Sequence, residues 1–225
     1  MKKTMTVLGA LLTAGSLLAQ SSSVTDTDGD GNIYGNASGV VIDFDSTAAS
    51  AAVWSPPLSA GTTYNLNSLS FRQGSTTDAA SLYLGVYTGL ASGVLSGFLG
   101  TSANAINWST VAGGTWAQYT FSGINVTADS TVGSGSGLLY FIFQAETTAI
   151  GGTEVGDISL QRINGYGSSD TMPTDLNYVI AYGAPVTTRA LEYQATVTPV
   201  PEPASLAMIG LWGVELLLVI RRQKK

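Results

Sequence analysis

The chain has 225 residues and a formal net charge of −6, and it contains neither cysteine nor histidine. A length of this order accommodates one domain with processing segments at its ends. The missing residue types exclude disulfides, thiolate metal sites, cysteine nucleophiles and histidine-based catalysis such as the Ser-His-Asp triad. We therefore expect a non-enzymatic protein without a tightly bound cofactor.

The N-terminus has the three-part layout of a secretory signal peptide. Lys2 and Lys3 form a basic start, residues 7–18 form an apolar stretch, and Ala19 is a small residue that suits cleavage. We assign residues 1–19 to a signal peptide, for which the secretion translocon is the expected partner. The alternative is an N-terminal membrane anchor that stays attached.

An acidic stretch, DTDGDGNI, begins at Asp26. Asp26, Asp28 and Asp30 place oxygen ligands at alternate positions, and a glycine permits a tight turn, as in the first eight positions of a calcium loop. The twelfth position, where such a loop carries a bidentate acid, is Ala37. The pattern predicts weak calcium binding at the three aspartates, and the alternative is a solvated, turn-rich lead.

Residues 20–198 are predicted to form one all-β domain. Short segments rich in β-branched, aromatic and leucine residues recur between Gly, Ser, Asn and Pro, which is the pattern of strands. Many short strands at this spacing indicate an antiparallel β-sandwich with a jelly-roll-like arrangement. The segment 138–143 is apolar on both faces and is therefore predicted to be a central strand. We predict strands at residues 40–44, 66–71, 82–87, 116–121, 138–143, 158–160, 178–182 and 191–197.

Two tryptophans in predicted loops, Trp54 and Trp108, are candidates for glycan binding. Jelly rolls bind sugars through exposed aromatic rings that stack on the apolar faces of the sugar. A concave surface that displays both rings would make the domain a carbohydrate-binding module. A third tryptophan, Trp116, is predicted to lie in the core with Tyr119 and Phe121.

Two pairs of carboxylates lie close in sequence, Asp43 with Asp45 and Glu154 with Asp157. Paired carboxylates carry out glycoside hydrolysis when they flank the scissile bond. Residues two apart on a strand share one face, so we expect Asp43 and Asp45 to point outward together, with their apolar neighbours inward. We interpret them as an ordinary solvated face and predict no catalytic residue.

Charge is distributed unevenly along the chain. Residues 20–200 contain three basic side chains, Arg72, Arg162 and Arg189, against 13 acidic ones, which leaves a net charge of −10. Binding to nucleic acid requires Lys and Arg for the phosphates. We therefore exclude a nucleic-acid partner and expect an extracellular protein.

The C-terminus combines a proline hinge, an apolar segment and a basic tip. Pro201, Glu202 and Pro203 form the hinge within residues 200–205, and 17 mostly apolar residues follow at 204–220. A helix of that length spans ~26 Å, the lower limit for crossing a bilayer. By the positive-inside rule the tip would remain cytoplasmic. The tip, residues 221–225, contains Arg221, Arg222, Lys224 and Lys225.

These three parts in this order resemble the PEP-CTERM sorting signal of Gram-negative bacteria. The resemblance covers residues 199–225, and Glu215 departs from the usual purely apolar segment. It implies that an exosortase in the inner membrane removes the helix and that the protein moves to the cell surface or extracellular polysaccharide. Residues 98–126 are also similar in style to the β-rich ectodomains of such proteins, whose activity is unassigned.

The resemblance implies a secreted structural or adhesive protein of the envelope or exopolysaccharide, anchored in the membrane only until it is processed. Two alternatives remain open at this point. One is a carbohydrate-binding module on the cell surface, and the other is a bitopic membrane protein whose tail is never cut.

Overall fold

A computed structural model of the chain describes residues 21–26, 29–44, 54–75, 81–130, 137–151, 158–163, 178–181, 184–186 and 191–201. The chain divides into two units, Ser21–Thr198 and a second unit made of the two ends. The predicted signal peptide and apolar tail segment lie outside the described residues. Within the described ranges, no helix is long and apolar enough to cross a membrane.

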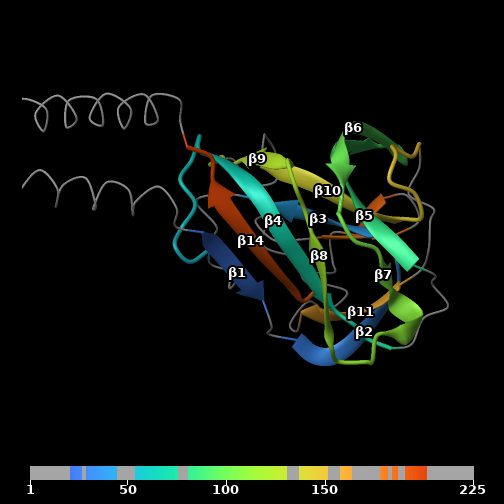
Figure 1. Cartoon of the computed structure of the whole chain (residues 1–225). Helices are drawn as coiled ribbons and strands as arrows, with labels where there is room; N and C mark the ends of the chain where they lie inside the picture. The colour runs from blue at the N-terminus through green and yellow to red at the C-terminus, as the bar shows by residue number, and fades with distance from the viewer. Residues whose placement is uncertain are drawn as a thin grey trace, which may run out of the picture. The chain divides into compact units, whose positions relative to one another are not determined.

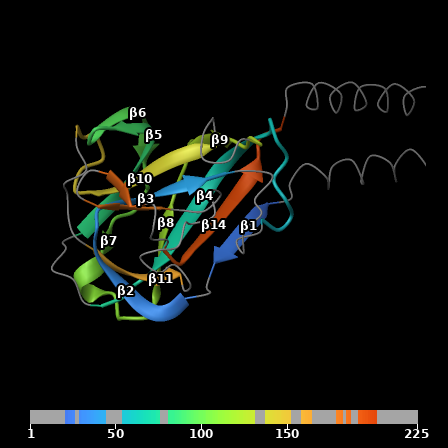
Figure 2. The same cartoon turned by 180° about the vertical axis from the view of Figure 1, so that it is seen from behind.

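The unit Ser21–Thr198 is an all-β sandwich of two antiparallel sheets (Figures 1 and 2). The first sheet has the strand order β1-β14-β4-β8, and β9 also pairs with β4. Its strands are β1 (Ser22–Asp26), β4 (Thr63–Arg72), β8 (Trp116–Thr120), β9 (Asn125–Thr127) and β14 (Tyr193–Pro199).

The second sheet has the order β13-β12-β3-β10-β5-β6, and β7 also pairs with β5. A separate two-stranded ribbon joins β2 to β11, and one 3₁₀ turn, η1, follows β7. The strands of the second sheet are β3 (Gly39–Asp43), β5 (Ser81–Ala91), β6 (Val94–Thr101), β7 (Ile106–Asn107), β10 (Leu138–Gln144), β12 (Tyr178–Ala181) and β13 (Ala184–Val186). The ribbon strands are β2 (Gly29–Ala37) and β11 (Ile158–Ile163), and η1 spans Trp108–Thr110.

Each of the eight predicted strands coincides with an observed one, within a few residues at the ends. The central position predicted for residues 138–143 is confirmed, because β10 lies between β3 and β5. Six further strands were not predicted from the sequence: β1, β2, β6, β7, β9 and β13. Among these, β2 and β6 are rich in glycine, which weakens the period-two pattern of a strand.

An aromatic layer fills the space between the sheets. Phe143 of β10 packs edge-on against Phe71 of β4, with ring centroids 5.6 Å apart and planes at 70°. It also packs edge-on against Trp108 of η1 at 6.0 Å and lies 6.2 Å from Tyr119 of β8. All four side chains are fully buried. Because these strands belong to opposite sheets, the layer holds the two sheets together.

The outer face of the second sheet is also largely apolar. Val41, Tyr87, Leu95, Ile142 and Ile180 form a second buried cluster there, separate from the main core. This explains why the second sheet reads as apolar on both faces in the sequence.

The segment that follows β10 is tied to this outer cluster by hydrogen bonds. The Tyr87 hydroxyl donates to Gln144 Oε1 at 2.9 Å and accepts from the Ile150 N–H at 2.9 Å. Gln144 Nε2 in turn donates to the carbonyls of Glu146 and Thr148. The buried amide of Gln144 is thus satisfied by the segment that covers it.

Truncating the centre of the aromatic layer is expected to destabilise the fold strongly. Phe143→Ala removes a buried ring that contacts both sheets, and we expect a loss of about 3–5 kcal/mol in the free energy of unfolding. Phe98→Ala, the same truncation at a partly exposed ring of β6, is the matched control and should cost roughly half as much or less. Urea denaturation measures both, and equal losses would contradict the assignment of Phe143 to the inter-sheet layer.

Candidate functional site

The predicted calcium ligands do not lie in one continuous loop. Asp26 is the last residue of β1, where it pairs with Tyr193, and Asp30 belongs to β2. Asp28 lies outside the described residues. From residue 29 onward the backbone is a strand paired with β11, and a strand advances ~3.3 Å per residue.

The predicted loop, and the alternative of a turn-rich lead, are therefore wrong for residues Gly29–Ala37, which form the strand β2. A calcium loop wraps its later ligands around the ion, whereas an extended strand carries them away from it. Within the described part of the chain, no three acidic side chains gather closely enough to hold a metal ion. Calcium binding at the three aspartates stays a prediction.

The prediction that Asp43 is solvent-exposed is wrong, since its side chain is only 5% exposed. The side chains of Val40, Ile42 and Phe44 point into the main core. Asp43 alternates with them along the strand and therefore points to the other face, as predicted. The outer face of β3 is also covered, however, by the second apolar cluster. The other predicted carboxylates, at positions 45, 154 and 157, lie outside the described residues.

Both tryptophans proposed as sugar platforms are buried. Trp54 is 4% exposed and packs against Phe44 with ring centroids 5.5 Å apart. Trp108 is 0% exposed, and its indole N–H donates to the Tyr119 hydroxyl at 2.8 Å. An indole has only this one donor, so nothing of Trp108 is left for a ligand. The two rings therefore do not form the exposed concave face that the carbohydrate-binding alternative requires.

The remaining aromatic predictions are confirmed in part. Tyr119 and Phe121 are buried as expected, whereas Trp116 at the start of β8 is partly exposed. Burial raises the pKa of the Tyr119 hydroxyl, and the hydrogen bond from Trp108 opposes part of this rise. The hydroxyl therefore stays neutral and acts as a structural acceptor in the core.

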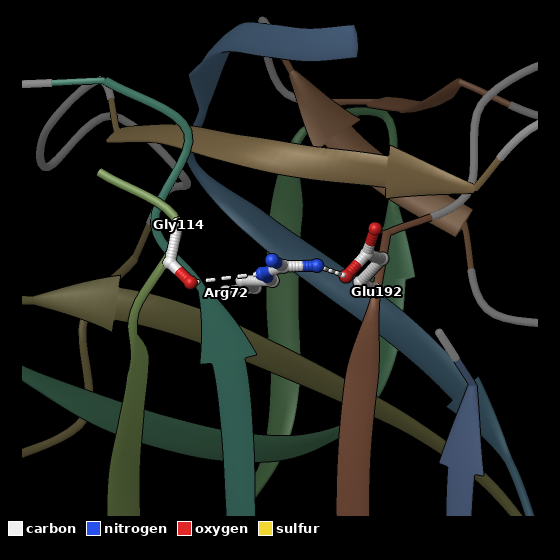
Figure 3. Close-up of polar contacts among 3 residues, drawn as sticks. All are labelled: Arg72, Gly114 and Glu192. Carbon is white, nitrogen blue, oxygen red and sulfur yellow. Dashed lines mark hydrogen bonds and ion pairs between the residues drawn. The ribbon is translucent and has the colours of Figure 1, made fainter. Parts of the chain in front are cut away.

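The most distinctive polar feature is a partly buried ion pair that was not predicted from the sequence (Figure 3). Arg72, the last residue of β4, places Nη1 3.2 Å from Glu192 Oε2, and its Nε donates to the Gly114 carbonyl at 2.9 Å. The Glu192 side chain is 1% exposed and that of Arg72 is 36% exposed. One guanidinium thus connects β4, the turn before β8 and the residue before β14.

Two glutamines surround this ion pair. The Glu192 N–H donates to the Gln161 carbonyl at 3.0 Å, and Gln73, next to Arg72, pairs with Leu160 in an isolated bridge. Three buried side-chain oxygens of the cluster have no hydrogen-bond donor among the described residues: Gln73 Oε1, Gln161 Oε1 and Glu192 Oε1. The cluster is therefore rich in acceptors and holds one buried anion against one cation.

The sequence indicates that Arg72 needs an anionic partner, but it does not indicate which residue that partner is. Arg72 is one of only three basic residues between positions 20 and 200, and a guanidinium at the end of an apolar strand requires an anion. Glu192 lies 120 positions further along the chain. Only the neighbouring positions of β4 and β14 in the first sheet bring the two together.

The proline hinge begins directly after the sandwich in the chain. β14 ends at Pro199, and Pro201 is exposed to solvent. Glu202, Pro203 and the basic tip at 221–225 lie outside the described residues. Pro201, the first residue of the hinge, thus follows the last strand by two residues.

Comparison with protein-family models, with curated proteins and with solved structures finds no match to this chain.

Removing one partner of the ion pair is expected to lower the free energy of unfolding more than replacing both partners by apolar residues. Arg72→Met leaves the Glu192 carboxylate buried without its cation, which costs about 3–5 kcal/mol when such a pair is fully buried, and less here because the arginine is partly exposed. The double variant Arg72→Met/Glu192→Leu removes the stranded charge and should recover most of the loss. Urea unfolding of the two single variants and the double variant provides the cycle, and strictly additive losses would contradict the coupling.

Proposed function

We propose that the chain is a secreted, non-catalytic β-sandwich that serves as a structural or adhesive component of the envelope or extracellular polysaccharide. A PEP-CTERM-type signal at the C-terminus would direct this sorting, with an exosortase and the secretion translocon as partners. The observation that carries the proposal is the order of the three tail parts. The Pro201-Glu202-Pro203 hinge, the apolar residues 204–220 and the basic tip 221–225 follow one another without interruption.

The described residues support this proposal at the junction with the tail. β14 is an interior strand, paired with β1 on one side and next to β4 on the other. It ends at Pro199, before the hinge. A cut at the hinge would therefore leave every hydrogen-bonded residue of β14 in the mature protein. Exposure of Pro201 also suits recognition by a processing enzyme.

We further propose that the sandwich has jelly-roll topology. The antiparallel neighbours are nested along the chain: β5 pairs with β6, β4 with β8, β3 with β10 and β1 with β14. Nested pairs of this kind arise when one long hairpin is wound across two sheets, as in a jelly roll. In this assignment the additions to the eight-stranded frame are β2, β7, β9, β11, β12 and β13.

The strongly acidic domain also suits an extracellular structural role. A net charge of −10 over residues 20–200 favours solubility and disfavours nonspecific association of copies. The carbohydrate-binding alternative loses its two candidate platforms, since Trp54 and Trp108 belong to the core. We therefore do not propose a glycan site at those residues.

Replacing the acidic residue of the hinge should block release. In a Gram-negative host that carries an exosortase, we expect wild-type protein in the surface fraction, with a mass that ends near residues 201–203. Glu202→Ala should instead accumulate as full-length protein in the inner membrane, because an uncut apolar helix has no easy route out of the bilayer. Intact-mass analysis of the membrane and surface fractions distinguishes the two states.

Glu215→Leu is the control, since it removes an acidic residue of the tail but leaves the hinge unchanged. It should strengthen membrane residence and still permit cutting. Surface protein that still carries residues 221–225 would contradict the sorting proposal. Full-length protein in the membrane irrespective of residue 202 would support the permanent bitopic anchor.

A further inference from the structure

β6 forms one edge of the second sheet. It pairs with β5 along one side, and no strand among the described residues pairs with its other side. In both views of the sandwich β6 lies at the periphery, beyond β5 (Figures 1 and 2). An edge strand presents unpaired backbone N–H and C=O groups that another strand can bind.

The sequence of β6 lacks two of the usual protections of such an edge, charged residues and proline. Natural edge strands carry charged residues, above all lysine, or proline, whereas Val94–Thr101 reads VLSGFLGT and contains neither. Among the described residues the large apolar side chains classed as exposed are Val94 and Leu99, at 60% and 42%. Both lie on this strand.

The first half of β6 is the regular part of the edge. The turn residues Ser92 and Gly93 both have positive φ, 51° and 79°, which matches the twist of a two-residue hairpin. Ala91 pairs with Val94 and Leu90 with Leu95. In such a hairpin the residues flanking the turn form the closing hydrogen-bonded pair, so the backbone N–H and C=O of Leu95 point away from β5.

The second half of β6 is irregular. The register shifts between Val86 and Tyr87, and Gly97 and Gly100 both have positive φ. Bulges and twists of this kind shorten the length of edge that can pair. The irregularity therefore limits a partner to a short strand and prevents extended stacking.

The distribution of charge indicates what the partner is. Between Asp78 and Asp129 there is no charged residue, and this uncharged run contains β5, β6, β7, β8 and β9. The net charge of −10 therefore lies entirely in the rest of the domain. Two copies of so acidic a domain repel each other, and the repulsion is weakest where both present the uncharged region.

We propose that β6 pairs with β6 of a second copy of this chain, antiparallel and across a two-fold axis. Each copy then supplies the same segment, as an isologous interface requires. The pairing joins the two second sheets edge to edge, with Val94 in the regular half of β6 that pairs and Leu99 in the irregular half beside it. This inference does not depend on how the chain is sorted.

The proposal is tested by mass as a function of concentration. Full-length protein in mild detergent should show a monomer–dimer equilibrium by analytical ultracentrifugation, and added salt should strengthen the dimer because it screens the repulsion between acidic domains. Val94→Glu/Leu99→Glu should raise the dissociation constant by roughly tenfold or more, since it places carboxylates of both copies close together at the joined edges. Both side chains are exposed, so the monomer should keep its stability.

Ser59→Glu/Ala60→Glu is the matched control, because it adds the same charge at exposed positions away from β6. It should dimerise like the wild type. A second readout uses the absence of native cysteine: Val94→Cys, Ser96→Cys or Leu99→Cys should form a disulfide-linked dimer on oxidation, whereas Ser59→Cys should not. A monomer at all concentrations, equal weakening by both double variants, or equal crosslinking at residue 59 would overturn the proposal.

Discussion

The structure depends on the closure of two sheets over one aromatic layer. Phe143 lies at the centre of this layer and contacts Phe71, Trp108 and Tyr119, which come from the opposite sheet and from the turn η1. The chain contains no disulfide, since it has no cysteine, so apolar burial carries the stability of the sandwich. The largest side chains are accordingly used for packing. Trp54 and Trp108, which would suit a binding surface if exposed, are therefore unavailable for it.

The same constraint moves the polar chemistry to the ends and edges of the sandwich. Because the second sheet is covered on both faces, even Asp43 is buried, and no open sheet face with paired carboxylates forms among the described residues. The partly buried ion pair between Arg72 and Glu192 lies at the end of β4, where three segments converge. The free side of β6 lies at the edge of the second sheet. These two places, rather than the tryptophans, distinguish this domain from a plain sandwich.

The fold class and the central strands were predictable from the sequence because alternating apolar residues are a local signal. β10 was identified as central from its own six residues, without any knowledge of its partners. β6 was missed since glycine and serine interrupt its alternation, and β2 was interpreted as a metal loop because its aspartates and glycines also suit a tight turn. Its pairing with β11 decides between the two, and pairing is not a local property.

The site predictions succeeded less often for a related physical reason. Burial of Trp54 and Trp108 depends on what packs over a loop, and the sequence of the loop does not contain that information. The partner of Arg72 lies in a distant strand, so only the sheet order identifies it. The sorting motif is different, since its physical content is contiguous in the chain, and the structure describes it only up to Pro201.

The central claim is that Trp54 and Trp108 are packed in the core of the sandwich. Quenching of tryptophan fluorescence tests this claim most directly. In the variant Trp116→Phe/Trp212→Phe, emission comes only from Trp54 and Trp108, which are 4% and 0% exposed. Iodide, which is excluded from apolar cores, should leave the emission of the native protein nearly unchanged and quench it strongly after unfolding in urea. Quenching of the native protein as strong as that of the unfolded chain would contradict the account, because the rings would then lie at the surface.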